Sequence, residues 1–388
     1  MSQAVVEETA IAAPSLNHLA KFFLKLGVVA FGGPAAHIAM MEDELVRRRH
    51  WVSSEDFLDL LAVSNLLPGP SSTELAIFIG YRLRGFAGLL LAGICFILPA
   101  FLIVGILAWA YVRYGGLPAV AGLLYGVKPV VIAIVLQALW RLGKSAVKTR
   151  TLAAMGVMAL VACFLGASPL LVLFGTAAVI ALIYAIRQRP TVSTMSAFFV
   201  TSMPVAASSP AIAGLAGIFL VFVKLGCIVF GSGYVLLAFL RADLVVHRHW
   251  LTEAQLLDSV AVGQVTPGPV FTTATFIGYL LGGPTGAIVA TAGIFAPAFV
   301  FVALAGPLVR TLRASKIAGM LLDGLNVASL ALMGYVTYQL ARSAVTDWPT
   351  LTLEIISAAV LFTLRINSTW LIAAGALFGL GLTLLGKQ

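Results

Sequence analysis

Charged residues are scarce in this sequence. Asp, Glu, Lys and Arg together make up 10% of the 388 residues, whereas a soluble domain carries about 25%. Hydrophobic residues make up 61% of the chain, and the mean hydropathy is +1.04. A soluble fold of this length cannot bury that much apolar surface, so the composition excludes an ordinary soluble domain and indicates a lipid environment.

Cysteine is also rare, and Cys95, Cys163 and Cys227 show neither a CxxC motif nor metal-ligand spacing. We therefore predict no disulfide framework, no metal site and no cofactor. A Walker A sequence is missing as well, so we do not expect ATP hydrolysis or any other enzyme activity. The net charge of +9 falls in short clusters between apolar runs, which is typical of topology determinants, and we expect no nucleic-acid partner.

Long apolar runs are abundant. Examples are Phe86–Val112, Leu117–Trp140, Leu170–Ile186 and Ala287–Leu308. A helix needs about 20 such residues to cross the hydrocarbon of a bilayer. The sequence therefore predicts an all-α, polytopic membrane protein.

The two halves of the chain repeat each other. A shift of 199 residues places Lys25 on Lys224, and it also aligns the Arg-His-Trp and Pro-Gly-Pro motifs at Arg49–Trp51 and Arg248–Trp250 and at Pro68–Pro70 and Pro267–Pro269. After a one-residue adjustment, Ser145–Val147 falls on Ser343–Val345. This internal duplication predicts four parts, namely an N-terminal tail over 1–15, a first membrane repeat over 16–190, a connector over 191–210 and a second membrane repeat over 211–388.

The distribution of Lys and Arg shows how the repeats are oriented. The first half carries basic clusters at Arg82–Arg84 and Arg141–Arg150, whose equivalents in the second half are nearly uncharged. The second half instead carries basic residues at Arg310–Lys316, opposite a sparsely charged turn of the first half. Because cytoplasmic loops are enriched in Lys and Arg, this swap predicts two inverted repeats, with about ten transmembrane helices plus one re-entrant hairpin in each half.

Each predicted hairpin is broken at its Pro-Gly-Pro motif, because proline removes a backbone donor and clashes with the preceding helical turn. The hydroxyl residues after the breaks are expected to cap a helix N-terminus; they are Ser71, Ser72, Thr73, Thr272 and Thr273. A helix N-terminus at membrane depth presents N–H groups and about half a positive charge, which together form an anion site. A proline kink in a spanning helix is the alternative.

We predict that the substrate-binding residues gather around these breaks and around a second pair of Gly-rich interruptions. They are Lys25, Gly32, Gly33, Asn65, Pro68, Gly69, Pro70, Ser71 and Ser72 in the first half, and Lys224, Gly231, Ser232, Gly233, Gln264, Gly268, Thr272 and Thr273 in the second. The alternatives are helix packing for the glycines, snorkelling to the interface for the two lysines, and backbone pairing for the two amides.

Two charged residues occur in one half only. Glu74 follows the first break and has a threonine near its equivalent position, and Lys128 corresponds to Asn326. Both are candidates for coupling, with an interfacial position as the alternative, and Glu74 is a candidate carrier of a coupling proton. His50 and His249, in the Arg-His-Trp motifs, are expected to be interfacial anchors or caps.

The duplicated series of Phe31–Pro34, Arg49–Trp51, Pro68–Pro70 and Phe78–Tyr81 resembles the chromate ion transporter family in its long, two-domain form. The resemblance covers essentially the whole chain after the N-terminal tail. It implies gradient-driven efflux of chromate across the bacterial cytoplasmic (inner) membrane, with sulfate as the structural analogue of the cargo. Phe230–Gly233 lacks the proline of the first-half motif, so the two halves differ at this position.

The spacing of the breaks indicates only that the transported substrate is an anion. The resemblance to the family implies that this anion is chromate. Two other functions stay open, namely an importer or exchanger of sulfate or another anion, and a membrane enzyme or scaffold that handles lipid. The expected partners are a chromate-like or sulfate-like oxyanion and the lipid bilayer, and a homodimer is left open.

Overall fold

The computed structural model describes residues 14–31, 33–187, 214–230, 233, 235–309, 316–364 and 368–385, and its regular elements in these ranges are all helices. The first half contains α1 (Leu16–Val29), α2 (Pro34–Met41), the π-helix η1 (Glu42–Arg48), α3 (Ser54–Ser64), α4 (Ser71–Tyr114), α5 (Pro118–Ala146), α6 (Arg150–Phe164) and α7 (Pro169–Arg187). The second half contains α8 (Leu215–Ile228), α9 (Leu236–Leu240), the π-helix η2 (Arg241–His247), α10 (Glu253–Val265), the short 3₁₀ helix η3 (Val270–Thr272), α11 (Thr273–Ala305), the 3₁₀ helix η4 (Gly306–Leu308), α13 (Lys316–Ala344), α14 (Trp348–Thr363) and α15 (Ser368–Leu384). The predicted tail up to residue 13 and the predicted connector over 191–210 lie outside the described residues.

The apolar helices confirm the all-α, polytopic prediction. By length and composition, four of the described helices can cross a membrane: α4, α5, α11 together with η3, and α13 from Gly319 onward. Five shorter apolar helices accompany them. Large apolar side chains such as Ile106, Leu171 and Leu304 are more than 60% exposed, as expected for residues that face lipid.

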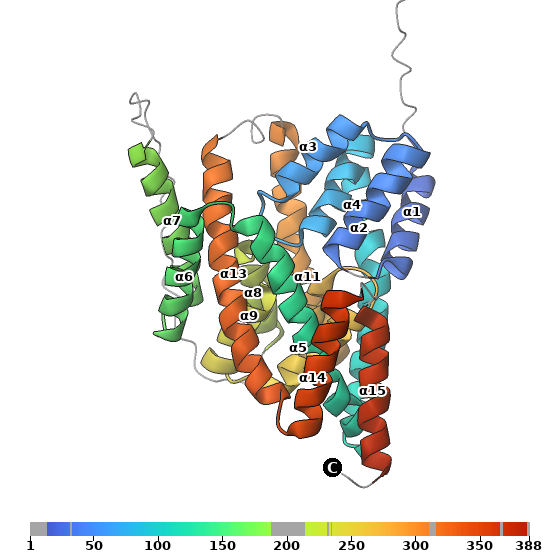
Figure 1. Cartoon of the computed structure of the whole chain (residues 1–388). Coiled ribbons are helices and arrows are strands. Elements are labelled where there is room, and N and C mark those ends of the chain that lie inside the picture. The colour runs from blue at the N-terminus through green and yellow to red at the C-terminus, as the bar shows by residue number, and fades with distance from the viewer. Residues whose placement is uncertain are drawn as a thin grey trace, which may run out of the picture.

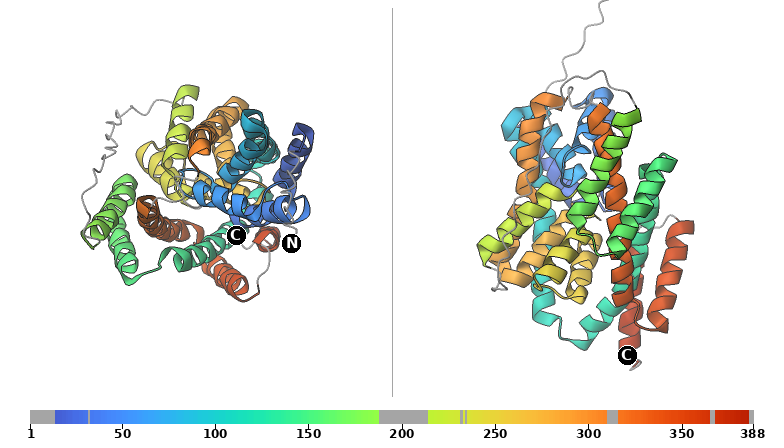
Figure 2. Two further views of the ribbon diagram at one scale, coloured as in Figure 1. Left: turned by 90° about the horizontal axis from the view of Figure 1, so that it is seen from above. Right: turned by 90° about the vertical axis from the view of Figure 1, so that its left-hand side faces the viewer.

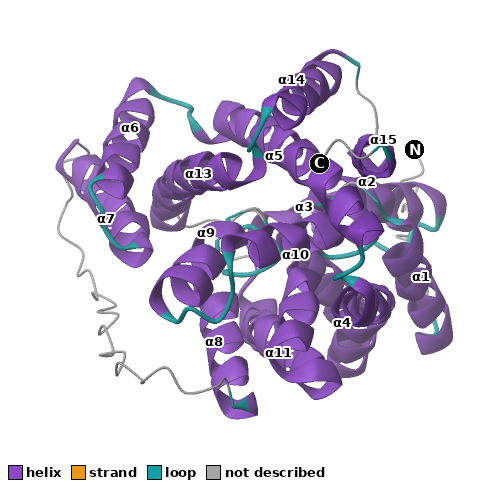
Figure 3. Ribbon diagram, turned by 90° about the horizontal axis from the view of Figure 1, so that it is seen from below, coloured by secondary structure: helices purple, strands orange, loops and turns teal. Residues whose placement is uncertain are grey.

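The helices form two layers with shorter elements between them. Seen from below, α6, α7, α13, α5, α14 and α15 follow one side of the molecule, and α8, α11, α4 and α1 follow the other (Figure 3). The short helices α2, α3, α9 and α10 fill the space between these layers (Figure 3). Helices of one half pack on helices of the other in both layers, since α15 contacts α5, α13 contacts α7, and α11 contacts α4.

Equivalent helices of the two halves run in opposite directions. In Figure 1, the longer arm of α4, after its kink at Gly85, descends to a cyan end near the bottom, whereas the longer arm of α11, after its kink at Gly283, rises to an orange end. The side view in Figure 2 shows the same arrangement. Likewise α5 rises from Pro118 to Ala146, and its equivalent α13 descends (Figure 1). The predicted inverted repeat is therefore confirmed.

A sharp kink divides both of the longest helices into two arms. In α4 the backbone leaves the helical region at Arg84 and Gly85, and in α11 it does so at Gly282 and Gly283. Gly85 has φ 57° and Gly283 has φ 62°, a conformation in which glycine avoids the steric cost of a Cβ atom. As a result, the arm after each kink turns back along the arm that follows the Pro-Gly-Pro break, and Gly80 lies against Gly88 as Gly278 lies against Gly286.

The two Pro-Gly-Pro breaks meet the other half at the centre of the molecule. The Gly69 N–H donates to the Val229 carbonyl at 2.7 Å, and the Gly268 N–H donates to the Ala30 carbonyl at 3.1 Å. These two bonds are equivalent under the repeat, because Gly69 aligns with Gly268 and Ala30 with Val229. At each break, a backbone N–H group therefore pairs with a carbonyl group of the other half. Without this hydrogen bond, the N–H group would be unpaired in hydrocarbon.

The Arg-His-Trp motifs end the π-helices η1 and η2. His50 and His249 have φ 51° and 53°, so each turns the chain directly after the C-cap residue of its π-helix, which is Arg49 or Arg248. Arg49 lies over the Trp51 ring at 4.7 Å, and Arg248 lies over the Trp250 ring at 4.9 Å. These contacts hold each tryptophan at the end of its helix.

Candidate functional site

A cavity of about 780 Å³ lies between the two layers, next to both Pro-Gly-Pro breaks. Its wall includes Asn65 and Ser71 beside the first break and Gln264 and Gly268 beside the second. Much of the rest of the wall comes from the upper part of α5 and the residues just after it, between Ile134 and Lys148, from the upper part of α13 and from the start of α2. The cavity therefore extends from the centre of the molecule toward the end at which α5 finishes (Figure 1).

The charge of this cavity is positive. Arg141 and Lys148 line it, and no lining residue is an Asp or a Glu. Lys148 also forms a salt bridge, in which its Nζ lies 2.7 Å from Asp323 Oδ1. Within the described part of the chain, Arg141 has no salt-bridge partner, so its guanidinium is available for an anionic ligand.

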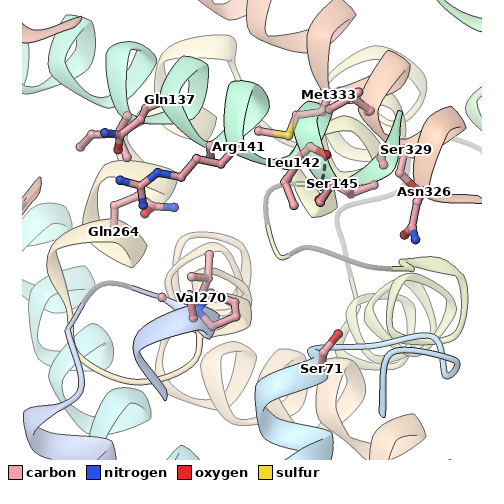
Figure 4. A pocket seen from close by; sticks show the side chains of 18 of the residues that line it. Ser71, Gln137, Arg141, Leu142, Ser145, Gln264, Val270, Asn326, Ser329 and Met333 are labelled. Carbon is pink, nitrogen blue, oxygen red and sulfur yellow. Dashed lines mark hydrogen bonds between the residues drawn. The ribbon is translucent and has the colours of Figure 1, made fainter. Parts of the chain in front are cut away.

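Hydroxyl and amide groups complete the lining. Figure 4 shows the side chains of Arg141, Gln264, Ser71 and Asn326 extending toward the same cavity from four different helices. Amides and hydroxyls donate hydrogen bonds, and an arginine presents a planar fork of N–H groups that matches an oxyanion. A cavity of this size and lining suits a small, hydrated oxyanion.

The structure brings five of the predicted site residues to this cavity: Gly33, Asn65, Ser71, Gln264 and Gly268. Pro68, Gly69 and Pro70 form the break itself, and Gly233 packs against Val270 beside a much smaller pocket. Gly32, Gly231 and Ser232 lie outside the described residues. The direct role of these residues in binding stays a prediction.

The capping prediction for the hydroxyl residues is wrong. The N-cap of α4 is Pro70 and that of α11 is Thr272, and neither helix receives a hydrogen bond from a side-chain cap. Ser72 instead contacts Nδ1 of the buried His37 at 3.1 Å, whereas Thr272 and Thr273 donate to the carbonyls of Pro269 and Val270. The reason is that the proline at each break already sets the backbone for the following turn, so the hydroxyls bond elsewhere: Thr272 and Thr273 within that turn and Ser72 to His37.

Lys25 and Lys224 do not line the cavity. Lys25 is exposed on α1. The Lys224 Nζ lies 2.8 Å from Asp243 Oδ2, and Arg248 contacts the other oxygen of this carboxylate at 3.0 Å. Burial alone would raise the pKa of Asp243, but hydrogen bonds and charge from Lys224 and Arg248 hold it below its ordinary value. In this conformation Lys224 therefore anchors η2 to α8.

Glu74 lies in the first turn of α4 and is completely buried. Neither carboxyl oxygen has a hydrogen-bond partner among the described residues. A Cβ atom on Gly69 would lie 2.5 Å from Glu74 Oε1, so the carboxyl group packs directly against the first Pro-Gly-Pro break. An unpaired, buried carboxylate is costly, which makes Glu74 sensitive both to a proton and to charge in the cavity nearby.

Lys128 is paired across the two halves. Its Nζ lies 3.3 Å from Asp258 Oδ1, and the Tyr111 hydroxyl donates to Asp258 Oδ2 at 2.9 Å. Asp258 is equivalent to Asp59 under the repeat. The sequence did not indicate this contact, because Lys128 and Asp258 are distant in sequence.

Sequence reasoning missed the cation that matters most to the cavity. Arg141 was assigned to a topology-determining cluster, Gln137 and Ser329 carried no motif, and Ser145 was noted only as part of the repeat. A signal for Arg141 was present, because its equivalent in the second half is Gln339, which makes it a one-sided charge like Lys128.

The chain is similar to known proteins over both repeats. The family model described as chromate transporter matches residues 17–183 and again residues 216–380. The chain belongs to the chromate transporter family. Since the family model matches twice, each repeat of this chromate transporter family member corresponds to one copy of the family unit.

Curated relatives cover nearly the full length of this family member. A chromate transport protein of Cupriavidus metallidurans is 35% identical over 376 residues, which are 94% of this chain and 93% of the relative. A probable chromate transport protein of Synechococcus elongatus is 34% identical and covers 88% of this chain and 89% of its own. A chromate transport protein of Pseudomonas aeruginosa is 34% identical over 88% of this chain and 85% of its own. No solved structure matches.

Proposed function

We propose that this protein is a secondary transporter that exports chromate, or a related divalent oxyanion such as sulfate, across the bacterial cytoplasmic membrane. One observation carries the proposal: the cavity beside both helix breaks is lined by Arg141 and Lys148 and by no carboxylate. A dianion in this cavity meets positive charge and hydrogen-bond donors from the residues that line it.

The arrangement of the repeats supports transport as the activity. Two inverted repeats with broken helices at their interface place a binding site near the middle of the membrane, and exchange of their conformations opens that site to alternate sides. The domain bounds 16–190 and 211–388 belong to this proposal as the two units that exchange. Relatives that match both units are named chromate transport proteins, which supplies the cargo.

The charge distribution supports the orientation of the open cavity. The kink of α4, which carries Arg82 and Arg84, and the junction of α5 and α6, which carries Lys144, Lys148 and Arg150, lie toward the same end of the molecule (Figure 1). By the positive-inside rule this end faces the cytoplasm. The cavity then receives a cytoplasmic anion, which is the state from which export begins.

Flux measurements on reconstituted protein and on everted vesicles test this function. Everted vesicles should accumulate labelled chromate in response to an imposed gradient, and unlabelled sulfate should compete. Faster uptake into right-side-out vesicles would support the importer or exchanger instead. No anion-dependent flux in either orientation would contradict transport and leave the lipid-handling enzyme or scaffold.

The substitution Arg141→Gln tests the cavity as the binding site. Loss of a charged hydrogen-bond donor is expected to weaken chromate binding by about 10-fold to 100-fold, measured as the KM for flux from the cytoplasmic face. Lys144→Gln is the matched control, because it removes the same charge from the same helix at a residue that does not line the cavity. Equal KM values for the two variants would place the anion elsewhere.

A further inference from the structure

A partly buried polar cluster lies on the side of the centre away from the cavity. It consists of Lys128 on α5, Asp258 on α10 and Tyr111 near the lower end of α4. Asp258 is only 3% exposed, and it bridges the other two residues with its two oxygens. The cluster therefore joins two helices of the first half to the hairpin helix of the second.

Apolar packing seals the space around this cluster. Val104, Ala108 and Phe276 are completely buried there, and Val262, one turn after Asp258 on α10, packs against them beside Tyr111. Figure 3 shows α10 from below, between α4, α11 and α5. Separation of α10 from α4 and α5 would break the bonds of Asp258 and expose Val262 on this lower side.

The repeat alignment indicates what Lys128 does once the lower side opens. Lys128 is equivalent to Asn326, and Asn326 lines the cavity that is open in this conformation. When inverted repeats exchange their conformations, each residue takes the place of its equivalent on the opposite side. Lys128 would then line the lower cavity where Asn326 lines the upper one.

The lower cavity would otherwise lack a cation at the matching positions. Arg141 corresponds to Gln339 and Lys148 to Thr346. Of the residues equivalent to Asn326, Arg141 and Lys148, only Lys128 is a cation. Tyr111 and Asp258 correspond to Val309 and Asp59, so the first half does not repeat the cluster.

We propose that Lys128 is the anion-binding cation of the outward-open state, and that Asp258, held by Tyr111, masks it and gates the outer side in the conformation described here. The inference rests on the proposed transport function for the identity of the anion. Lys128 exchanges one anionic partner for another, since it pairs with the Asp258 carboxylate when the gate is closed and with the oxyanion when it is open. An oxyanion with two charges competes with that carboxylate better than one with a single charge, so the exchange also favours divalent cargo.

Cysteine accessibility tests the gate without any transported ion. Val262→Cys is introduced into the full chain with Cys95, Cys163 and Cys227 replaced by Ser, and the rate of labelling by an impermeant maleimide is measured from outside intact cells. Asp258→Asn should speed labelling about tenfold, because loss of the ion pair shifts the population toward the outward-open state. The matched control is Glu253→Gln, which removes another ion-pair carboxylate of α10, bonded to Arg241 at 2.6 Å within the same half, and should leave the rate unchanged.

A double variant keeps this test decisive if Asp258→Asn alone fails to fold, since that substitution leaves the partly buried Lys128 without its partner. Lys128→Gln combined with Asp258→Asn leaves no unpaired charge and should also speed the labelling of Val262→Cys. Labelling at the original rate in the folded double variant would overturn the gate.

Affinity measured separately from each side tests the role of Lys128. In proteoliposomes of known orientation, Lys128→Gln should raise the half-inhibitory concentration of sulfate added at the outer face about tenfold, and leave that at the cytoplasmic face unchanged. An equal change at both faces, or no change at the outer face, would overturn the assignment of Lys128. If unmodified protein transports neither chromate nor sulfate, the proposed function fails, while the labelling experiment still decides whether the gate exists.

Discussion

At the scale of single residues, charges that occur in only one repeat distinguish the chemistry of the two halves. Glu74, Lys128 and Arg141 have uncharged residues at or near their equivalent positions. The structure places Arg141 in the cavity, Glu74 beneath the first break and Lys128 against Asp258. Three charges that look similar in the sequence therefore have three different environments.

Glu74 is the residue expected to link transport to protons. Its carboxyl group is buried, lacks a hydrogen-bond partner within the described residues and touches the backbone of Gly69. A proton on Glu74 removes a negative charge close to the anion cavity, so protonation and anion binding favour each other.

Glu74→Gln should therefore abolish the dependence of flux on pH while leaving a folded, anion-binding protein. The measurement is sulfate flux over a series of pH values in proteoliposomes, because sulfate keeps its double charge throughout that series. Asp56→Asn, on the neighbouring helix α3 and paired with Arg82 at 3.4 Å, is a carboxylate control that should keep the original profile. A pH profile of Glu74→Gln that matches the unmodified protein would remove Glu74 from coupling.

At the scale of elements, the kinked arms of α4 and α11 explain why glycine recurs at fixed positions in both repeats. The arms fold back so closely that a Cβ atom on Gly80 would lie 2.2 Å from the Gly88 carbonyl oxygen, and one on Gly278 would lie 2.4 Å from the Gly286 carbonyl oxygen. This contact sets the depth of each Pro-Gly-Pro break, because the arm between the break and the kink cannot slide along its neighbour.

Gly80→Ala should destabilise the protein by about 1–3 kcal/mol, because the added methyl group overpacks this contact with backbone. Gly105→Ala on the same helix meets open space and should be neutral or slightly stabilising, since alanine favours the helix. Thermal unfolding of the two variants in the same detergent makes the comparison. A similar Tm for both would show that the arms are not tightly packed.

At the scale of the whole molecule, the two repeats are inverted and interlocked. Each break donates a backbone hydrogen bond to the other half, and helices of opposite halves pack together in both layers. Neither repeat completes the site alone, because the cavity draws Asn65, Ser71 and Arg141 from the first half and Gln264 and Asn326 from the second.

The inversion predicts that equivalent residues face opposite sides of the membrane. Ser145 and Ser343 are equivalent, and both are exposed near the ends of α5 and α13. With the native cysteines replaced, Ser145→Cys should react with an impermeant maleimide from the cytoplasmic side and Ser343→Cys from the outer side. Reaction of both residues from one side would contradict the inverted arrangement.

Much of the fold was predictable because it follows from local properties of the chain. Hydropathy summed over about 20 residues indicates a membrane protein. Identical motifs indicate the duplication, and the distribution of Lys and Arg indicates the inversion. Breaks at Pro68–Pro70 and Pro267–Pro269 followed from the chemistry of proline, whatever the rest of the chain does. The count of about ten spans stays a prediction, because short helices such as α6 and α14 fall below the length that decides a crossing.

The sequence by itself determined that this is a duplicated, inverted membrane protein with a broken helix in each half. Only the tertiary structure decided that Arg141 faces the cavity, that Lys224 pairs with Asp243, and that Lys128 pairs with Asp258. The physical reason is that hydropathy and backbone preference act over a few neighbouring residues, whereas the partner of a buried charge depends on which distant helices pack against it. A lysine in an apolar run has the same sequence signature whether it lies at the interface, binds an anion or pairs with a carboxylate.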